Sequence, residues 1–188
     1  MGEEIWETEK TEKMIGHIRR PEGHFYADLI AQIVKLTGCE TYLELGTYYG
    51  NTVEKVFPLV KRCICVDVVD MRTVKLGEFY QTTTDKFFEY FRDMIDLGFV
   101  DADHHFESVK RDFDHIIKLL NQRGIIILHD TDPIDKASTD FTLCGDVYKV
   151  VDYIQSTYPE LNVVTLPVSD MGLTIVNRKR DRRIFSYV

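Results

Sequence analysis

The sequence of 188 residues predicts an α/β domain in which helices cover both faces of a mainly parallel β-sheet. Three observations support this fold class. Short apolar segments alternate along the chain with segments whose apolar residues recur at helical spacing. Polar or glycine-rich residues directly follow several of the apolar segments, as they do at the carboxyl ends of parallel strands. No repeat, low-complexity tract or linker rich in Pro, Gly and Ser divides the sequence.

The composition is that of a globular protein, with 44% hydrophobic and 29% charged residues, which excludes wholesale disorder. The net charge of -8 argues against a general nucleic-acid-binding protein. No apolar run approaches the ~18 residues of a membrane span, and the Glu-rich N-terminus lacks the apolar region of a signal peptide. We therefore expect a cytoplasmic protein whose four cysteines (Cys39, Cys63, Cys65 and Cys144) are reduced and buried.

The first half of the chain begins with a charged, weakly periodic segment, which we interpret as an N-terminal arm over residues 1–22 before a single domain over 23–188. The expected elements are a helix over residues 24–37, a strand over 41–45, a helix to about 59, a strand over 62–69, a weaker strand over 78–81 and a helix with three phenylalanines. Gly38 ends the first helix. The expected caps of the later two helices are Asn51 or Thr52 and Thr84 or Asp85.

The second half contains the clearest helix of the chain, over residues 106–120, with six apolar residues on one face. The expected elements are a strand over 95–100, that helix, a strand over 125–128, a polar loop over 131–145, a helix over 146–157 and strands over 163–166 and 173–176. A basic tail, residues 178–183, follows. Because parallel sheets bind ligands beyond the carboxyl ends of their central strands, the residues after each strand are the candidate site.

A glycine-bounded turn follows the first strand, with the sequence ELGTYYG over residues 44–50. Its glycines let the backbone turn sharply and lie close to a ligand, and the next helix offers free amide groups. The spacing is not that of a dinucleotide-binding turn, because Thr47 and Tyr48 interrupt it and Val53 replaces the last glycine. Glu44 suits a ligand with a cationic end. A tight turn that serves packing alone is the structural alternative.

Carboxylates follow three of the other expected strands. Asp67 is placed to accept hydrogen bonds from two ribose hydroxyls, although a solvated turn aspartate explains it equally well. Asp101 and Asp130 end neighbouring strands, which lie about 5 Å apart, so they can meet around one divalent cation. Capping of the following helix by Asp103 explains part of this cluster but does not explain His129 beside Asp130.

With these residues in place, the sequence resembles the class I S-adenosylmethionine-dependent methyltransferases, and within them a small O-methyltransferase-like subgroup. Four segments carry the resemblance: YLELGTYYG over residues 42–50, CVD over 65–67, DLGFVDADH over 96–104 and RGIIILHD over 123–130. The resemblance extends over residues 37–177 and implies a Rossmann-like, seven-stranded methyltransferase sheet.

The resemblance also implies roles for individual residues. The implied S-adenosylmethionine-binding residues are Glu44, Gly46, Thr47, Tyr48, Gly50, Thr52, Asp67, Thr84, Asp85 and Asp101. Glu44 would contact the cofactor's ammonium group, Asp67 its ribose, and Thr84 with Asp85 the edge of its adenine. The implied catalytic residues are His104, as general base, and Asp101. The implied ligands of Mg²⁺ or another divalent cation are Asp101, Asp130 and His129.

Two features depart from the family. Residues 68–77 are too few for a full crossover helix, so we expect the adenine pocket to be built differently there. His129 and Thr131 stand where metal-dependent relatives carry other residues, which leaves the need for a metal open.

We expect an enzyme that transfers a methyl group to an oxygen of a small-molecule acceptor, with no nucleic-acid or membrane partner. The alternatives are a non-catalytic S-adenosylmethionine-binding module and a nucleotide-cofactor oxidoreductase, and a homodimer is left open.

Overall fold

The computed structural model describes residues 25–167 and 171–180, so the arm predicted over residues 1–22 lies outside the described residues. The described elements are α2 (Phe25–Thr37), β1 (Thr41–Leu45), α3 (Asn51–Val56), η1 (Phe57–Leu59), β2 (Arg62–Asp67), β3 (Glu78–Gln81), α4 (Thr84–Tyr90), β4 (Ile95–Val100), α5 (Phe106–Leu119), β5 (Leu120–His129), η2 (Ala137–Thr139), α6 (Lys149–Thr157), β6 (Leu161–Leu166) and β7 (Leu173–Arg178). Among these residues, no helix is long and apolar enough to cross a membrane.

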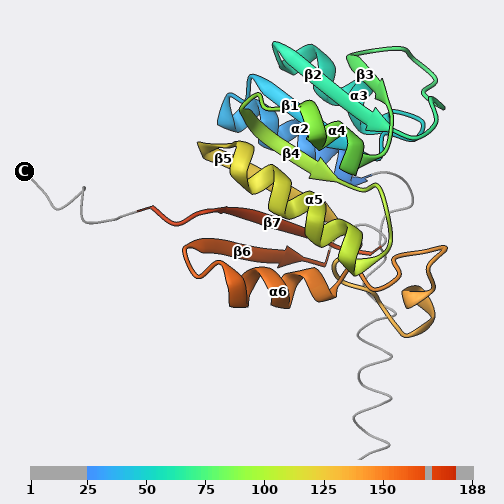
Figure 1. Cartoon of the computed structure of the whole chain (residues 1–188), viewed down its shortest axis with the longest axis vertical. Coiled ribbons are helices and arrows are strands. Elements are labelled where there is room, and N and C mark those ends of the chain that lie inside the picture. The colour runs from blue at the N-terminus through green and yellow to red at the C-terminus, as the bar shows by residue number, and fades with distance from the viewer. Residues whose placement is uncertain (1–24, 168–170, 181–188) are drawn as a thin grey trace, which may run out of the picture.

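The seven strands form one sheet in the order β3-β2-β1-β4-β5-β7-β6 (Figure 1). The first five strands in this order pair in parallel, and β7 runs antiparallel between β5 and β6. Helices α4, α5 and α6 pack on one face of the sheet through one apolar cluster, and α2 and α3 pack on the other face through a second cluster. The predicted fold class is confirmed.

The register of the central strands aligns their carboxyl ends. Leu45 of β1 lies opposite Val66 of β2 and Val100 of β4, and Val100 lies opposite Leu128 of β5. The next residue of each strand therefore belongs to one row across the edge of the sheet. That row consists of Asp67, Gly46, Asp101 and His129. The topology alone therefore places the side chains of Asp67, Asp101 and His129 at one edge of the sheet.

The connection between β2 and β3, residues 68–77, contains no helix, as its length predicted. Arg72 organises it from a nearly buried position. Its guanidinium binds both oxygens of Asp70, at 2.9 and 3.0 Å, and also donates to the carbonyl of Leu76. It lies 4.1 Å from the ring centroid of Phe79. A folded-back loop around one arginine thus replaces the usual crossover helix.

Several boundaries differ from the sequence-based expectation, and three of them have a clear physical reason. Strand β5 begins at Leu120, directly after α5, where Arg178 of β7 donates to the carbonyls of Leu120 and Asn121 at 3.0 and 3.2 Å. The cap of α4 is Thr83, whose side chain accepts a hydrogen bond from the amide of Lys86. The cap of α3 is Gly50, in the left-handed conformation. Tertiary contacts and backbone conformation, rather than local apolar pattern, set these ends.

Candidate functional site

A cavity of about 530 Å³ lies at the carboxyl edge of the sheet, which is within the usual size range of small-ligand sites. The predicted cofactor residues that line it are Glu44, Gly46, Thr47, Tyr48, Gly50, Thr52, Asp67 and Asp101. Thr84 and Asp85 are not among its lining residues, and Asp85 instead pairs with Arg111 at 3.3 Å. Their assignment to the adenine edge stays a prediction. His104 also lines the cavity, so one space connects the glycine turn to the predicted base.

The glycine turn contacts the end of β4 directly. Gly46 has a φ of 84°, and a Cβ atom on it would lie 2.0 Å from the carbonyl oxygen of Asp101. The amide of Asp101 donates to the carbonyl of Leu45 at 2.8 Å. Only glycine satisfies both the backbone conformation and this approach. The turn after β1 and the acidic turn after β4 therefore form one wall of the cavity.

Glu44 places a buried carboxylate beside that wall. Its side chain is 2% exposed and accepts a hydrogen bond from the hydroxyl of Tyr42. Burial raises the pKa of Glu44 well above its usual range, and negative neighbours that include Asp101 and Asp67 add to this effect. No Lys or Arg from the described part of the chain lines the cavity. A cationic ligand group beside Glu44 would offset the cost of burying its charge.

Asp67 also lines the cavity, and its carboxylate supports the glycine turn. Its two oxygens accept hydrogen bonds from the amides of Tyr48, at 2.8 Å, and Val69, at 3.2 Å. Tyr48 has a positive φ of 47°. Each carboxylate oxygen keeps a further lone pair, so Asp67 can support the turn and still accept hydrogen bonds from a ligand. The hydroxyl of Thr47, in the same turn, is buried without a hydrogen-bond partner in the described chain.

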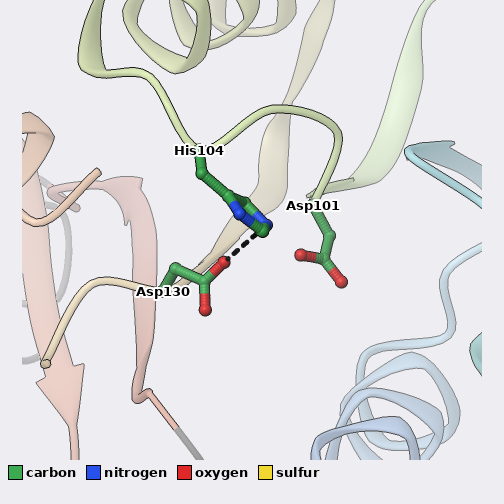
Figure 2. A group of neighbouring side chains, drawn as sticks. All are labelled: Asp101, His104 and Asp130. Atoms are coloured by element: carbon green, nitrogen blue, oxygen red, sulfur yellow. Dashed lines mark ion pairs between the residues drawn. The ribbon is translucent and has the colours of Figure 1, made fainter. Parts of the chain in front are cut away.

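A second group of polar side chains consists of Asp101, His104 and Asp130, of which Asp101 and His104 line the cavity. Figure 2 shows the imidazole of His104 between the two carboxylates. One donor atom from each residue lies within 4.8 Å of the others, so the group can hold a metal ion. The Nε2 atom of His104 is 3.4 Å from Asp130 Oδ2, and its Nδ1 atom is 3.2 Å from the carbonyl oxygen of Phe141. A carbonyl only accepts, so Nδ1 carries a proton and Nε2 is left to face Asp130.

His129 bridges the same two carboxylates from the buried side. Its Nδ1 atom lies 3.0 Å from Asp130 Oδ1 and 3.2 Å from Asp101 Oδ1. Burial lowers the pKa of His129, but the two carboxylates outweigh it and raise the pKa to about 10. The group of donor atoms that can share one ion consists of Asp101, His104 and Asp130 and does not include His129. Its role as a metal ligand stays a prediction.

The loop before α6 fixes His104 in place. A Cβ atom on Gly145 would lie 1.9 Å from the carbonyl oxygen of His104, and the amide of Asp146 donates to that same oxygen at 3.2 Å. The carboxylate of Asp146 accepts a hydrogen bond from the amide of Phe106 at 2.7 Å, which caps α5. Together with the carbonyl of Phe141, these contacts hold the backbone and the imidazole of His104 from one loop.

Six residues that line the cavity were not among the predicted site residues: Tyr26, Tyr49, Asn51, Phe99, Ala102 and Thr142. Tyr26 belongs to α2, which precedes every recognisable motif, and its ring lies 4.6 Å from that of His129 and 5.8 Å from that of Phe99. Phe99 reads as ordinary strand core in the sequence. Its position two residues before Asp101 was the signal that could have found it, because alternate residues of a strand share a face.

Comparisons with known proteins agree with this geometry. A family model described as a methyltransferase domain matches residues 43–131, which span β1 to β5 and include the glycine turn, Asp67, Asp101 and Asp130. No curated protein matches the chain in sequence.

Several solved structures share the fold at low identity. The S-adenosylhomocysteine-bound methyltransferase PaMTH1 of Podospora anserina is 15% identical, with 85% of this chain and 80% of that chain covered and a TM-score of 0.69. An O-methyltransferase of Bacillus cereus in complex with S-adenosylhomocysteine is 16% identical, with 92% and 89% covered and a TM-score of 0.61. The O-methyltransferase TomG of Streptomyces achromogenes, in complex with S-adenosylmethionine, is 13% identical, with 96% and 91% covered and a TM-score of 0.64.

The family match covers the turns that build the cavity, and the fold is shared with 89% and 91% of the two O-methyltransferase chains. Residues 43–131 therefore match a methyltransferase domain, and the chain has the fold of solved S-adenosylmethionine-dependent methyltransferases, as the resemblance of its sequence indicated.

Proposed function

We propose that this protein transfers the methyl group of S-adenosylmethionine to an oxygen of a small-molecule acceptor, which binds beside His104. The observation that carries the proposal is that one cavity is lined both by Glu44, the glycine turn and Asp67 and by His104. The similarity in fold to the Bacillus cereus and Streptomyces achromogenes O-methyltransferases supports the choice of an oxygen acceptor.

The residues around the glycine turn fit the cofactor chemically. The buried carboxylate of Glu44 has no Lys or Arg among the residues lining its cavity, and the cofactor's ammonium group supplies a positive charge. Asp67 accepts hydrogen bonds, which the two ribose hydroxyls donate. The unpartnered hydroxyl of Thr47 and the close approach allowed by Gly46 complete a cradle for the methionine part.

His104 is the proposed base. As the acceptor oxygen forms its bond to the methyl carbon and the bond from carbon to sulfur breaks, the hydroxyl proton moves to Nε2 of His104. The carboxylate of Asp130, 3.4 Å from Nε2, stabilises the imidazolium that results. Because the sulfonium already activates the methyl group, alignment of the two reactants supplies most of the remaining rate enhancement.

A second arrangement is supported by the proximity of the donor atoms of Asp101, His104 and Asp130. Two oxygens and one nitrogen suit a divalent cation that accepts both kinds of ligand. Such an ion would lower the pKa of the acceptor hydroxyl and orient it. In this arrangement His104 is a ligand rather than the base, so the two arrangements differ in whether the protein binds a cation.

A small-molecule acceptor fits a cavity of this size. The four cysteines are free and buried, which supports a reducing compartment such as the cytoplasm. A homodimer and the boundary between an arm over 1–22 and a domain over 23–188 stay predictions.

The cofactor assignment predicts a loss of affinity when either carboxylate is neutralised. Glu44→Gln and Asp67→Asn should each weaken S-adenosylmethionine binding by about 1.5–3 kcal/mol, or roughly ten- to a hundredfold, because a charge-assisted hydrogen bond is lost. Calorimetric titration measures the effect. Asp93→Asn is the control, since Asp93 is exposed and pairs with Arg62 away from the cavity. Parent-like affinity in both site variants would overturn the assignment.

The metal arrangement predicts stabilisation by added cation. Mn²⁺ or Mg²⁺ at 100 times its Kd should stabilise the parent by about 2.7 kcal/mol by mass action, and the melting temperature should rise accordingly. Asp130→Asn should remove this shift. Asp103→Asn should keep it, because Asp103 pairs with the exposed His105 outside the ligand group. If neither cation shifts the melting temperature of the parent, the metal arrangement is excluded and His104 acts without one.

A further inference from the structure

We propose that Tyr26, with Phe99 behind it, recognises the positive charge on the cofactor's sulfur and so makes this site prefer S-adenosylmethionine over S-adenosylhomocysteine. The inference rests on the proposed function of the cavity. It concerns a residue of α2, which lies outside the matched methyltransferase domain and carries no predicted role.

The register of the sheet places Phe99 beside Glu44. The two residues are direct partners on the parallel strands β1 and β4, which lie about 4.8 Å apart. Both line the cavity, and so does Asp101, two residues further along β4. Phe99 therefore lies beside Glu44, whose carboxylate is proposed to face the ammonium group. It also lies two residues before Asp101, which supplies a second carboxylate.

Tyr26 of helix α2 packs against Phe99. Helix α2 packs on the same face of the sheet as Phe99, and the two rings have centroids 5.8 Å apart with an interplanar angle of 38°. Tyr26 also lines the cavity together with Glu44 and Asp101. The space between the glycine turn and α2 is therefore bounded by two aromatic rings and two carboxylates.

The chemistry of the cofactor places a cation there. Three carbon atoms separate its amino nitrogen from its sulfur, so an ammonium group beside Glu44 brings the sulfonium close to Phe99 and Tyr26. Aromatic faces attract cations through the ring quadrupole, and this attraction is stronger in partly desolvated positions. The product lacks both the methyl group and the charge. An aromatic ring that contacts the sulfur therefore discriminates between S-adenosylmethionine and S-adenosylhomocysteine. A ring that contacts the ammonium group does not, because both molecules carry that group.

The alternative is that Tyr26 has a purely structural role and does not recognise the sulfonium. Its ring lies 4.6 Å from that of His129, which bridges Asp101 and Asp130, so it also shields that buried ion pair. If shielding were its whole role, substitution would lower the melting temperature and weaken both cofactor forms by the same factor.

The test is to measure the Kd of S-adenosylmethionine and of S-adenosylhomocysteine by calorimetry for the parent and for variants of the full chain. Tyr26→Leu and Tyr26→Gln should reduce the ratio of the two affinities about three- to thirtyfold, mainly through weaker S-adenosylmethionine binding. Tyr26→Phe should keep the ratio, because the aromatic face remains. Tyr49→Leu is the matched control, since this tyrosine lines the cavity at the glycine turn, and it should change both affinities alike.

Equal weakening of both ligands in the two non-aromatic variants would overturn the inference while leaving the cofactor site in place. If the parent binds neither ligand, the proposed function itself fails and this inference falls with it. A melting curve for each variant identifies any that does not fold, and the remaining non-aromatic variant then decides the comparison.

Discussion

Replacement of His104 with alanine is expected to lower the rate of methyl transfer by a factor of about 10²–10⁴, the usual contribution of a general base. The imidazole is placed for this role because the carbonyl of Phe141 fixes the proton on Nδ1 and leaves Nε2 facing Asp130 and the cavity. The affinity for S-adenosylmethionine should stay within a few-fold of the parent. The measurement is the formation of S-adenosylhomocysteine with an acceptor that the parent methylates.

The neighbouring histidine provides the control. His105 is exposed, stacks on Phe141 at 4.4 Å and binds Asp103, so His105→Ala should retain most of the activity. A His104→Ala variant that turns over within a few-fold of the parent would show that the acceptor loses its proton to water. Combined with the cation-dependent melting temperature, the result separates a base from a metal ligand, since only the second role needs added Mn²⁺ or Mg²⁺.

Asp112→Asn is expected to remove about 3 kcal/mol of the loss of stability that the parent shows between pH 5 and pH 8. Asp112 lies on α5, is 1% exposed, and neither carboxylate oxygen has a hydrogen-bond partner in the described chain. Burial raises the pKa of its carboxyl to about 7, and Thr84 of α4 only partly counteracts this. Asp85, Arg111 and Asp103 are the charged groups around it.

The direction in which stability changes with pH follows from proton binding to Asp112. The unfolded chain releases this proton near pH 4 and the folded chain near pH 7, so the folded state binds more protons between these values and stability falls as the pH rises. Three pH units at about 1.4 kcal/mol each give a total of about 4 kcal/mol, of which about 3 kcal/mol falls between pH 5 and pH 8. Any cost of burying the new amide is independent of pH.

Urea unfolding of the parent and Asp112→Asn at pH 5 and pH 8 measures this difference. Asp152→Asn is the control, because Asp152 is exposed and is not among the charged groups around Asp112, so it should leave the pH dependence of unfolding near that of the parent. If the parent and Asp112→Asn lose stability in parallel over this range, Asp112 is not the group that titrates.

The sequence predicted the parts of the site that follow apolar strands, because the carboxyl ends of parallel strands lie at the same edge of a sheet. Asp67, Asp101 and the glycine turn fall in this class, and all three line the cavity. Tyr26 escaped prediction because its position depends on how α2 packs across the sheet, which no local pattern encodes.

One boundary has the same origin. Leu120 was expected to end a helix, yet it begins β5, where Arg178, 58 residues later, donates to its carbonyl. Contacts between distant segments decide the local structure there.

The attachment of the loop before α6 to His104 limits where this enzyme can acquire new acceptors. Phe141, Gly145 and Asp146 contact the backbone or imidazole of His104 or the first turn of α5, so changes there alter catalysis along with acceptor shape. Residues 132–140 make no such contact with His104, and most of them are at least partly exposed. Substitutions in this nine-residue stretch are therefore expected to disturb the placement of His104 less than substitutions at the three anchoring positions.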